Sequence, residues 1–385
     1  MPPRAAFVSF RFAAADGVSL VAATWMQVLD DLGFDVVTVS GDVSPPHIGR
    51  PHPHRPVAGL APDDPATATA TATATGAPDT TPAGIDTGAL EHALADVDLA
   101  VVENLLTAPF NLAASRAVAA ALAGRPALLH HHDPPWHRAD LAHVTELPAD
   151  DPAWRHVAVN AILRDELAAL GIEATVIHNA FGDPGPVDPA GRATLRAEVR
   201  AAVGLDAGDL VVAHPVRAIE RKNVPAALAL AEGLGATYWL LGPAEEGYAG
   251  TLERLLASAR CPVVHAPWTG SVATGPAAAG IHAAADHIAF PSTWEGFGNP
   301  PIEAALHRRP TTVGHYPVAG RLRALGFRWF DPGDVAGPAA LLAEPDGPAT
   351  VELLDHNHRI ARDNFGLGRM AERLTAVLDA AGWLP

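Results

Sequence analysis

Residues 291–306 read PSTWEGFGNPPIEAAL and directly follow an apolar run. The apolar run predicts a buried strand, and Gly296 and Gly298 allow the next loop to turn tightly and to approach a ligand closely. Asn299 is a favourable N-cap, and Pro300 suits the first position of a helix. A strand, a glycine loop and a helix in this order indicate an α/β fold, and the first amide groups of such a helix form an anion site.

Two glutamates flank this loop, Glu295 before the glycines and Glu303 near the first turn of the predicted helix. Carboxylates repel phosphate groups, but they are well suited to accept hydrogen bonds from sugar and ribose hydroxyls. The alternative is an ordinary capped helix, in which an early glutamate is favourable because of the helix dipole. That alternative explains Glu303 more readily than Glu295, which precedes the loop.

Lys222 is the only lysine among the 26 basic residues of the chain. It lies five residues after Arg217, just past the apolar run 210–213, which predicts another strand. An ammonium group is a compact point charge, so it can enter a phosphate pocket that a planar guanidinium would overfill. Open α/β sheets bind their ligands at the carboxyl ends of strands, where these two cations lie. The alternative is compositional drift that leaves one lysine by chance.

Strands and helices alternate on both sides of these motifs. The run 5–10, a helix with Val21, Trp25 and Leu29 on one face, and the run 35–40 predict an opening βαβ unit. Further strands are expected at 97–102, 126–129, 157–159, 175–177, 210–213, 237–241, 263–265, 287–290 and 311–313. The predicted fold class is therefore α/β, with two doubly wound Rossmann-like domains facing a cleft that binds a small molecule.

The domain boundaries follow from changes in composition. The segment 41–87 is predicted to be a low-complexity insertion, because its prolines and the Ala/Thr tract 66–75 bury little apolar surface. A stiff proline-rich stretch predicts a hinge between the domains. The expected division is an N-terminal domain at 1–183, a hinge at 184–206, a C-terminal domain at 207–355, and a final helix at 356–385 that packs back toward the first domain.

Composition limits the partners and the compartment. The 43 acidic residues outnumber the 26 basic ones and give a net charge of −17, which argues against nucleic acid or an anionic membrane as the main partner. The single Cys261 excludes an intramolecular disulfide and fits a reducing compartment. No apolar run reaches membrane-spanning length, and Arg11 and Asp16 interrupt the N-terminal apolar stretch. We expect a soluble cytoplasmic protein with no integral membrane segment.

Glu295 and Glu303, which are separated by seven intervening residues within EGFGNPPIEA, resemble the E-x7-E motif of retaining GT-B glycosyltransferases of family 4. Arg217 and Lys222 resemble the paired cations that this family places on the donor diphosphate. Two shorter runs resemble its interdomain signature and its mid-domain glycine turn, at 177–181 and 240–243. The resemblance covers both predicted domains and breaks only at the predicted insertion.

The resemblance implies the GT-B fold and the transfer of a sugar from a nucleotide-sugar donor to a small-molecule or glycan acceptor, without a metal cofactor. By this resemblance, Arg217 and Lys222 would neutralise the donor diphosphate and stabilise the leaving nucleotide. Glu303 would hold the ribose, and Glu295 the hydroxyls of the transferred sugar. The remaining donor-binding candidates are the loop residues Gly296, Phe297, Gly298 and Asn299.

Other functions are compatible with the same motifs. A sugar-nucleotide epimerase or a phosphorylase on this fold would also need a nucleotide or phosphate cleft. A non-catalytic sugar-nucleotide binder is a third possibility, but a decayed site would be expected to lose some of the charged residues that this chain keeps. The sequence does not identify the nucleotide base of the donor, the transferred sugar or the acceptor.

The loop after the first strand carries one glycine, Gly17, where the family usually has a pair. Gly17 and nearby amides are candidates to touch the donor phosphates or the acceptor. Asp16 is a candidate acceptor contact, and it is equally well explained as a helix cap.

Residues 130–138 read HHHDPPWHR at the end of a predicted strand. Strand alternation places His130 and His132 on one side and His131 on the other. Imidazoles and a carboxylate are proper metal ligands, but the spacing is not a standard zinc pattern, so no metal site is predicted. A further alternative is a set of histidines satisfied at a strand end. His132 resembles the family's strand-end histidine and is expected to orient the donor sugar, with Asp133 fixing its ring.

Three more residues are acceptor candidates. Trp136 and Arg138 could form a platform, because a flat aromatic face suits a sugar ring. Asn104 lies at the end of another first-domain strand.

Overall fold

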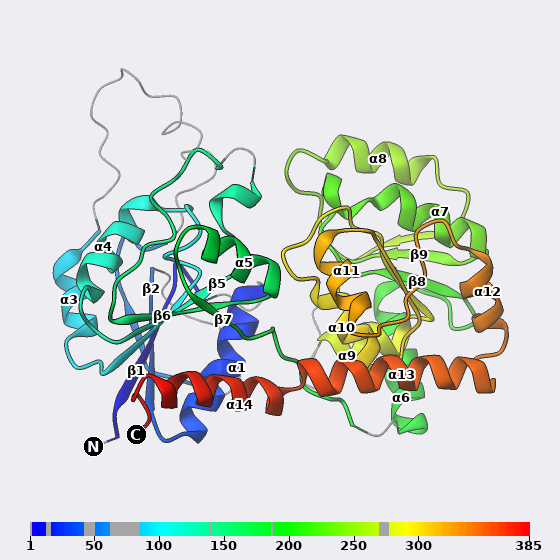
Figure 1. Ribbon diagram of the computed structural model, residues 1–385. Coiled ribbons are helices and arrows are strands. Elements are labelled where there is room, and N and C mark those ends of the chain that lie inside the picture. The colour runs from blue at the N-terminus through cyan, green and yellow to red at the C-terminus, as the bar shows by residue number, and fades with distance from the viewer. Residues whose placement is uncertain are drawn as a thin grey trace. The chain divides into compact units, whose positions relative to one another are not determined.

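The protein is described by a computed structural model that covers residues 2–12, 17–41, 51–61, 85–138, 141–185, 188–268 and 277–385 (Figure 1). The chain forms two compact units, the first made of Met1–Ala180 and Leu367–Pro385 and the second of Phe181–Gly366. Each unit is built on one sheet of parallel strands with accompanying helices. The predicted α/β class with two parallel sheets is confirmed.

The first unit contains a seven-stranded sheet in the order β3-β2-β1-β4-β5-β6-β7. Its strands are β1 (Arg4–Val8), β2 (Asp35–Ser40), β3 (His54–Pro56), β4 (Leu99–Glu103), β5 (Ala127–His131), β6 (Trp154–Ala158) and β7 (Ala174–Val176). Its helices are α1 (Gly17–Asp31), α3 (Thr87–Leu94), α4 (Leu112–Leu122), the short 3-10 helix η1 (Pro135–His137), α5 (Ala161–Ala169) and α14 (Leu367–Ala380).

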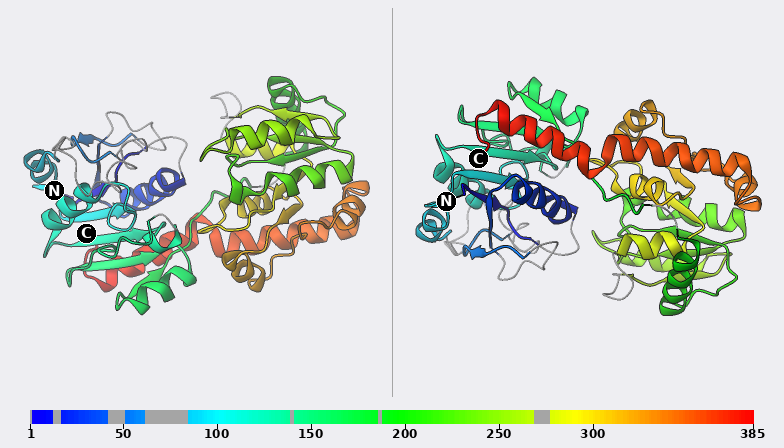
Figure 2. Two further views of the ribbon diagram at one scale, coloured as in Figure 1. Left: turned by 90° about the horizontal axis from the view of Figure 1, so that it is seen from above. Right: turned by 90° about the horizontal axis from the view of Figure 1, so that it is seen from below.

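Strand β1 lies in the middle of this sheet and supplies side chains to both of its faces. Ala6 and Val8 belong to one core cluster, together with residues of α3 and α4. Ala5 and Phe7 belong to the cluster on the opposite face, where α1 and α14 pack side by side (Figure 2). Since β1 pairs with β2 on one side and β4 on the other, the strand order reverses there, and the loops after β1 and β4 diverge to opposite faces.

The second unit contains a five-stranded sheet in the order β10-β9-β8-β11-β12. Its strands are β8 (Val211–His214), β9 (Thr237–Leu240), β10 (Val263–His265), β11 (His287–Phe290) and β12 (Thr311–Val313). Its helices are α6 (Pro189–Val203), the 3-10 helix η2 (Glu220–Lys222), α7 (Val224–Leu234), α8 (Ala249–Ala257), α9 (Ala277–Ala284), α10 (Asn299–Leu306), α11 (Pro317–Ala324), α12 (Ala336–Ala343) and α13 (Pro348–Phe365). The order reverses between β8 and β11, so the carboxyl ends of these two strands lie side by side at one edge of the sheet.

The segment 184–206, expected to be a hinge, contains helix α6 of the second unit. Asp188 caps this helix by accepting hydrogen bonds from the amides of Ala190 and Gly191. Pro189 stands in the first turn, where its fixed backbone angle favours a helix instead of interrupting one. The buried Val199 packs into the core of the second sheet. Within this proline-rich stretch, Pro189 therefore marks the start of a helix.

Part of the expected insertion 41–87 belongs to the first unit. Residues 51–61 supply β3, which pairs with β2, and Val57 and Leu60 are fully buried in the core. The Ala/Thr tract 66–75 lies outside the described residues. The C-terminal segment 356–385 likewise divides, because α13 ends in the second unit and α14 packs in the first.

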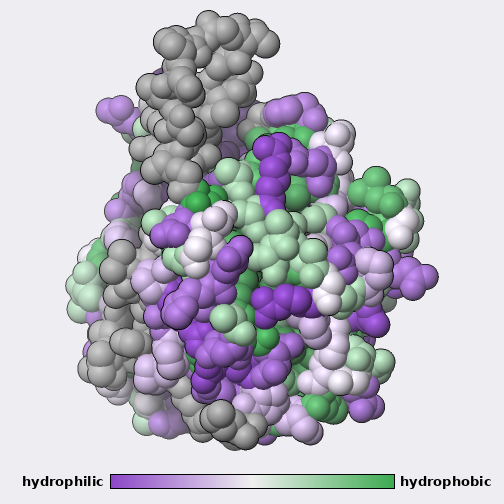
Figure 3. All heavy atoms as spheres, turned by 90° about the vertical axis from the view of Figure 1, so that its left-hand side faces the viewer, coloured by the Kyte–Doolittle hydropathy of each residue, from purple (hydrophilic) through white to green (hydrophobic). Residues whose placement is uncertain are grey.

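The face drawn in Figure 3 carries many hydrophilic side chains with smaller hydrophobic areas between them. Among the helices that the structure describes, none is both long and apolar enough to cross a bilayer.

Candidate functional site

In the second unit, the lone lysine meets the glutamate that precedes the glycine loop. Lys222 Nζ donates a hydrogen bond to Glu295 Oε1 at 2.5 Å. Arg221 Nη1 donates to the other oxygen of the same carboxylate, Oε2, at 2.9 Å. The contact arises because η2 follows β8 and the glycine loop follows β11, its neighbour in the sheet. The amide of Thr293 also donates to the carbonyl of Arg221 at 2.9 Å and ties the two loops together.

Lys222 is buried beside charged and aromatic side chains. Its side chain is buried, with only 9% of the residue exposed, and Nζ lies 5.1 Å from the centre of the Phe290 ring. Burial lowers the pKa of Lys222, and the adjacent Glu295 carboxylate acts in the opposite direction. A desolvated cation with one carboxylate partner interacts strongly with any anion that can reach it.

Arg217 makes its ion pair outside this cluster. Its guanidinium donates to Glu245 Oε2 at 2.5 Å, and the side chains of both residues are more than a third exposed. An exposed ion pair contributes little free energy, so Arg217 can exchange Glu245 for a ligand at small cost. Arg217 is nevertheless close enough to contribute to the lowered pKa of Lys222.

The glycine loop leads into α10, which begins one residue earlier than its sequence predicts. Gly298 occupies the N-cap with a φ of 97°, and Asn299 is the first helical residue. A side chain on Gly298 would collide with the Tyr316 hydroxyl, because a Cβ there would lie 2.6 Å from that oxygen. Glu303 lies on α10, partly exposed, and burial raises its pKa to about 7.

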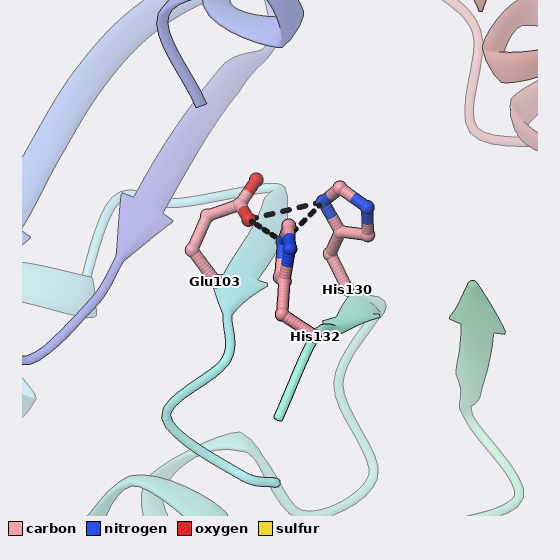
Figure 4. A group of neighbouring side chains, drawn as sticks. All are labelled: Glu103, His130 and His132. Atoms are coloured by element: carbon pink, nitrogen blue, oxygen red, sulfur yellow. Dashed lines mark hydrogen bonds and ion pairs between the residues drawn. The ribbon is translucent and has the colours of Figure 1, made fainter. Parts of the chain in front are cut away.

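In the first unit, three buried side chains converge where β4 and β5 end (Figure 4). Glu103 Oε2 lies 3.0 Å from His130 Nδ1 and 3.2 Å from His132 Nε2. The two ring nitrogens are 3.3 Å apart. The sheet register brings them together, because Glu103 is paired with His130 across β4 and β5.

This cluster holds a carboxylate that is ionised at neutral pH, beside a His130 imidazole that is neutral there. Burial raises the pKa of Glu103, but His130 and His132 outweigh it and lower the pKa to about 2. Burial lowers the pKa of His130 to about 4. Sequence reasoning missed Glu103 as a site residue. The available signal was a charged residue at the end of a buried apolar strand.

Asn104 fixes the backbone next to this cluster. Its Oδ1 accepts hydrogen bonds from the amides of His132 and Asp133, at 3.2 and 3.0 Å. Its Nδ2 donates to Asp133 Oδ2 at 3.2 Å. Asp133 was expected to fix the ring of His132, but that ring contacts Glu103, and the carboxylate of Asp133 bonds to Asn104. His131 points to the other side of the strand, where it contacts Thr107 and His156.

The remaining candidates of the first unit are spread around this edge. Trp136 Nε1 donates to Glu166 at 2.9 Å, which fixes the indole, and Arg138 lies over the Phe110 ring at 5.0 Å. Gly17 is the exposed first residue of α1. Asp16 lies outside the described residues.

The fold of this chain is similar to that of several solved structures, over nearly the whole length of both chains. The structure of Anabaena HepE in complex with UDP-glucose aligns over 98% of this chain and 99% of its own, with a TM-score of 0.67 and 17% identity. Sucrose-phosphate synthase from Thermosynechococcus elongatus aligns over 98% of both chains, with a TM-score of 0.68 and 14% identity. This is the GT-B fold. The GT-B prediction is confirmed.

Sequence comparison of this GT-B chain adds one curated relative. Mannosylglucosylglycerate synthase from Thermotoga maritima is 23% identical over 339 residues, which is 74% of this chain and 77% of the relative. No protein-family model matches the sequence.

The predicted site residues divide between the two units of the GT-B fold. The second unit carries most of the expected donor-binding residues, and within it the structure joins Lys222 to Glu295. The first unit carries the expected acceptor-side residues together with Gly17 and His132, which were both expected to contact the donor. Within this unit the structure joins His132 to Asn104 through the backbone and to Glu103 through the ring. Arg221 and Glu103 are the two residues that the structure adds.

Proposed function

We propose that this protein is a retaining glycosyltransferase of the family 4 type, which transfers a sugar from a nucleotide-sugar donor to a hydroxyl group of an acceptor. The observation that carries the proposal is the buried pair of Lys222 and Glu295 at the reversal point of the second sheet, with Glu303 following on α10. The similar chains support the proposal, since one was solved with UDP-glucose and another is a sucrose-phosphate synthase.

The Lys222–Glu295 contact suggests how a donor would be received. The diphosphate would accept hydrogen bonds from Lys222 Nζ, and Glu295 would keep Arg221 as its partner. Its freed oxygen could then accept hydrogen bonds from hydroxyls of the transferred sugar. Arg217 would leave Glu245 and add a second positive charge. These cations would perform the electrostatic work that a metal ion performs in other enzymes.

In the proposed reaction the bond between the anomeric carbon and the diphosphate oxygen breaks, and its electron pair stays with the leaving nucleotide. The acceptor oxygen bonds to the same carbon from the face that the nucleotide leaves, so the configuration is retained. The acceptor proton passes to the leaving phosphate oxygen. Lys222 stabilises the negative charge that develops on that phosphate, a contribution of several kcal/mol in a desolvated site.

The first-unit residues are proposed to serve the sugar and the acceptor. His132 would orient the transferred sugar, and Asn104 would position it through the backbone of the β5 end. Trp136 is held by Glu166, so its indole is a rigid surface suited to a sugar ring. Asp133 and Arg138 are further acceptor candidates. We place the enzyme in the cytoplasm, in keeping with its single cysteine, Cys261.

The test is calorimetric titration of UDP, GDP and ADP into the wild type and into Lys222→Ala, without added metal. We expect one nucleotide to bind the wild type and to bind the variant at least tenfold more weakly, because the variant lacks the buried ammonium. A turnover assay with the matching nucleotide-sugar then separates an enzyme from a binder. If no nucleotide binds, the donor assignment is wrong, and a phosphorylase that uses inorganic phosphate becomes the better explanation.

Glu303 gives the binding step a pH dependence. Its pKa is raised to about 7, so the carboxylate is mostly ionised at pH 8 and mostly protonated at pH 6. A ribose hydroxyl donates a stronger hydrogen bond to the ionised form. Nucleotide affinity is therefore expected to fall by up to roughly tenfold from pH 8 to pH 6. Calorimetry at both values measures this change.

The control for this pH effect is Glu303→Gln, which keeps the shape of the side chain and removes its titration. Its nucleotide affinity should be low and nearly the same at both pH values, apart from the titration of the phosphate itself. Equal pH dependence in the wild type and Glu303→Gln would show that Glu303 does not hold the ribose.

A further inference from the structure

Glu103, His130 and His132 present three possible metal ligands to one point (Figure 4). The distances between their ligand atoms are 3.0, 3.2 and 3.3 Å, so the atoms form a nearly equilateral triangle. A tetrahedral zinc ion with bonds of about 2.0–2.1 Å has its ligand atoms about 3.3 Å apart. We infer that these three side chains form a binding site for a divalent transition-metal ion, and that Zn²⁺ suits it best.

Hydrogen bonds alone satisfy this cluster poorly. Glu103 Oε2 can accept a hydrogen bond from each imidazole, but the two N–H groups then face each other across the third edge of the triangle. If one imidazole turns its unprotonated nitrogen inward instead, that lone pair faces the carboxylate. The second oxygen, Glu103 Oε1, is buried without a hydrogen-bond partner. A cation inside the triangle would be attracted by all three ligand atoms, and the second oxygen could share in binding it.

The ligands are held in place before any ion arrives. Glu103 and His130 are paired residues of neighbouring strands, and Trp25 stacks on the His130 ring at 4.1 Å. Asn104 Oδ1 holds the backbone of His132. Side chains fixed in this way lose little conformational entropy on binding. His132, 9% exposed, is the most accessible of the three and marks the path by which an ion would reach the site.

The donor set determines the kind of ion. Two imidazole nitrogens and one carboxylate favour zinc over magnesium or calcium, which prefer oxygen ligands alone. Three protein ligands leave a fourth position for water. His130 Nε2 is buried without a partner, so it lacks the outer hydrogen bond that most metal-bound imidazoles make. We therefore expect weaker binding than at a structural zinc site with a complete outer shell.

This inference does not depend on the proposed glycosyl transfer. The site lies wholly in the first unit, whereas the cations assigned to the diphosphate lie in the second. A bound ion would be coordinated by Nε2 of His132, so only Nδ1 of this ring would be left for other contacts. The ion would thus fix the ring and join the ends of β4 and β5.

The test is a titration of Zn²⁺ into metal-stripped wild-type protein in the presence of a chelating competitor, without nucleotide. One high-affinity ion per chain is expected. Glu103→Gln and His132→Ala should each weaken that binding by about a hundredfold or more, because the first replaces the anionic ligand by a neutral amide and the second removes an imidazole ligand. His315→Ala is the matched control, since His315 is an exposed histidine beside Asp331, and it should change the affinity less than twofold.

A second measurement does not rely on variants that could fail to fold. Co²⁺ added to the stripped wild type should give the intense visible absorption of a four-coordinate site, and Zn²⁺ should displace it at one equivalent. No high-affinity zinc uptake by the wild type, or uptake unchanged in a folded Glu103→Gln, would overturn the inference. Either result would leave the cluster as a hydrogen-bonded triad.

Discussion

Lys222→Arg is expected to lower kcat at least tenfold, although the variant keeps the positive charge. Nζ lies between the Glu295 carboxylate and the Phe290 ring, in a position that is 9% exposed. A planar guanidinium is wider than an ammonium and presents its donors in a fixed fork, so it cannot occupy this space without displacing its neighbours. Lys222→Ala should lower kcat further, by about 10²–10³-fold, because it removes a main stabiliser of the charge that develops on the leaving phosphate.

The control for this prediction is Arg221→Lys, the reverse exchange at the adjacent position. The Arg221 side chain is about one-third exposed and holds the same carboxylate from the other side, so the smaller cation has room there. We expect kcat of Arg221→Lys to fall only a few fold. The kcat of both variants is measured from initial rates at saturating nucleotide-sugar. Full activity in Lys222→Arg would show that the site needs a positive charge and not an ammonium group.

Glu295→Ala is expected to destabilise the second unit by about 3–5 kcal/mol, because it leaves Lys222 buried without its partner. The side chains of both residues are about one-tenth exposed, so solvent can compensate for little of this loss. The loss of Glu295 should cost less free energy at Arg221, since this side chain is more exposed and also donates a hydrogen bond to the carbonyl of Trp294. Chemical denaturation near neutral pH measures the change in the free energy of unfolding.

The matching control removes both charges. The double variant Lys222→Met with Glu295→Gln replaces the buried pair by neutral groups of similar volume, and it should be more stable than Glu295→Ala alone. A double-mutant cycle that includes Lys222→Met and Glu295→Gln as single variants gives the coupling energy directly. Strict additivity would mean that the 2.5 Å contact contributes nothing to stability. All of these variants should be poor catalysts, because the donor would lose the ammonium, the carboxylate or both.

The sheets were predictable because buried parallel strands are short apolar runs, which are visible in the sequence without tertiary information. The same runs placed Lys222 and Glu295 in loops that follow strands, but the contact between these two residues was not predicted. Two charged contacts were not predictable. Arg217 pairs with Glu245, and Glu103 with His130, across separations of 28 and 27 residues that no local pattern encodes.

The two misinterpreted segments share one physical cause. Proline was taken as a signal of irregular chain in both. In α6, Pro189 stands at a helix start, where no amide proton is required. In β3, Pro56 ends a three-residue strand at the edge of the sheet, a position that tolerates the missing donor. The meaning of a proline depends on its place within an element, and composition alone does not give that place.

The first unit is made of residues 1–180 and 367–385, so during synthesis its core is completed after that of the second unit. Met370, Leu374 and Leu378 of α14 close the core face that contains Phe7 and Trp25. A nascent chain emerging from the ribosome therefore carries this face open until its last helix has been made, whereas the contiguous second unit can complete its own core before then. Cells that produce this protein must keep the unfinished first unit from aggregating while roughly half of the chain is still being translated, at about 5–20 residues per second.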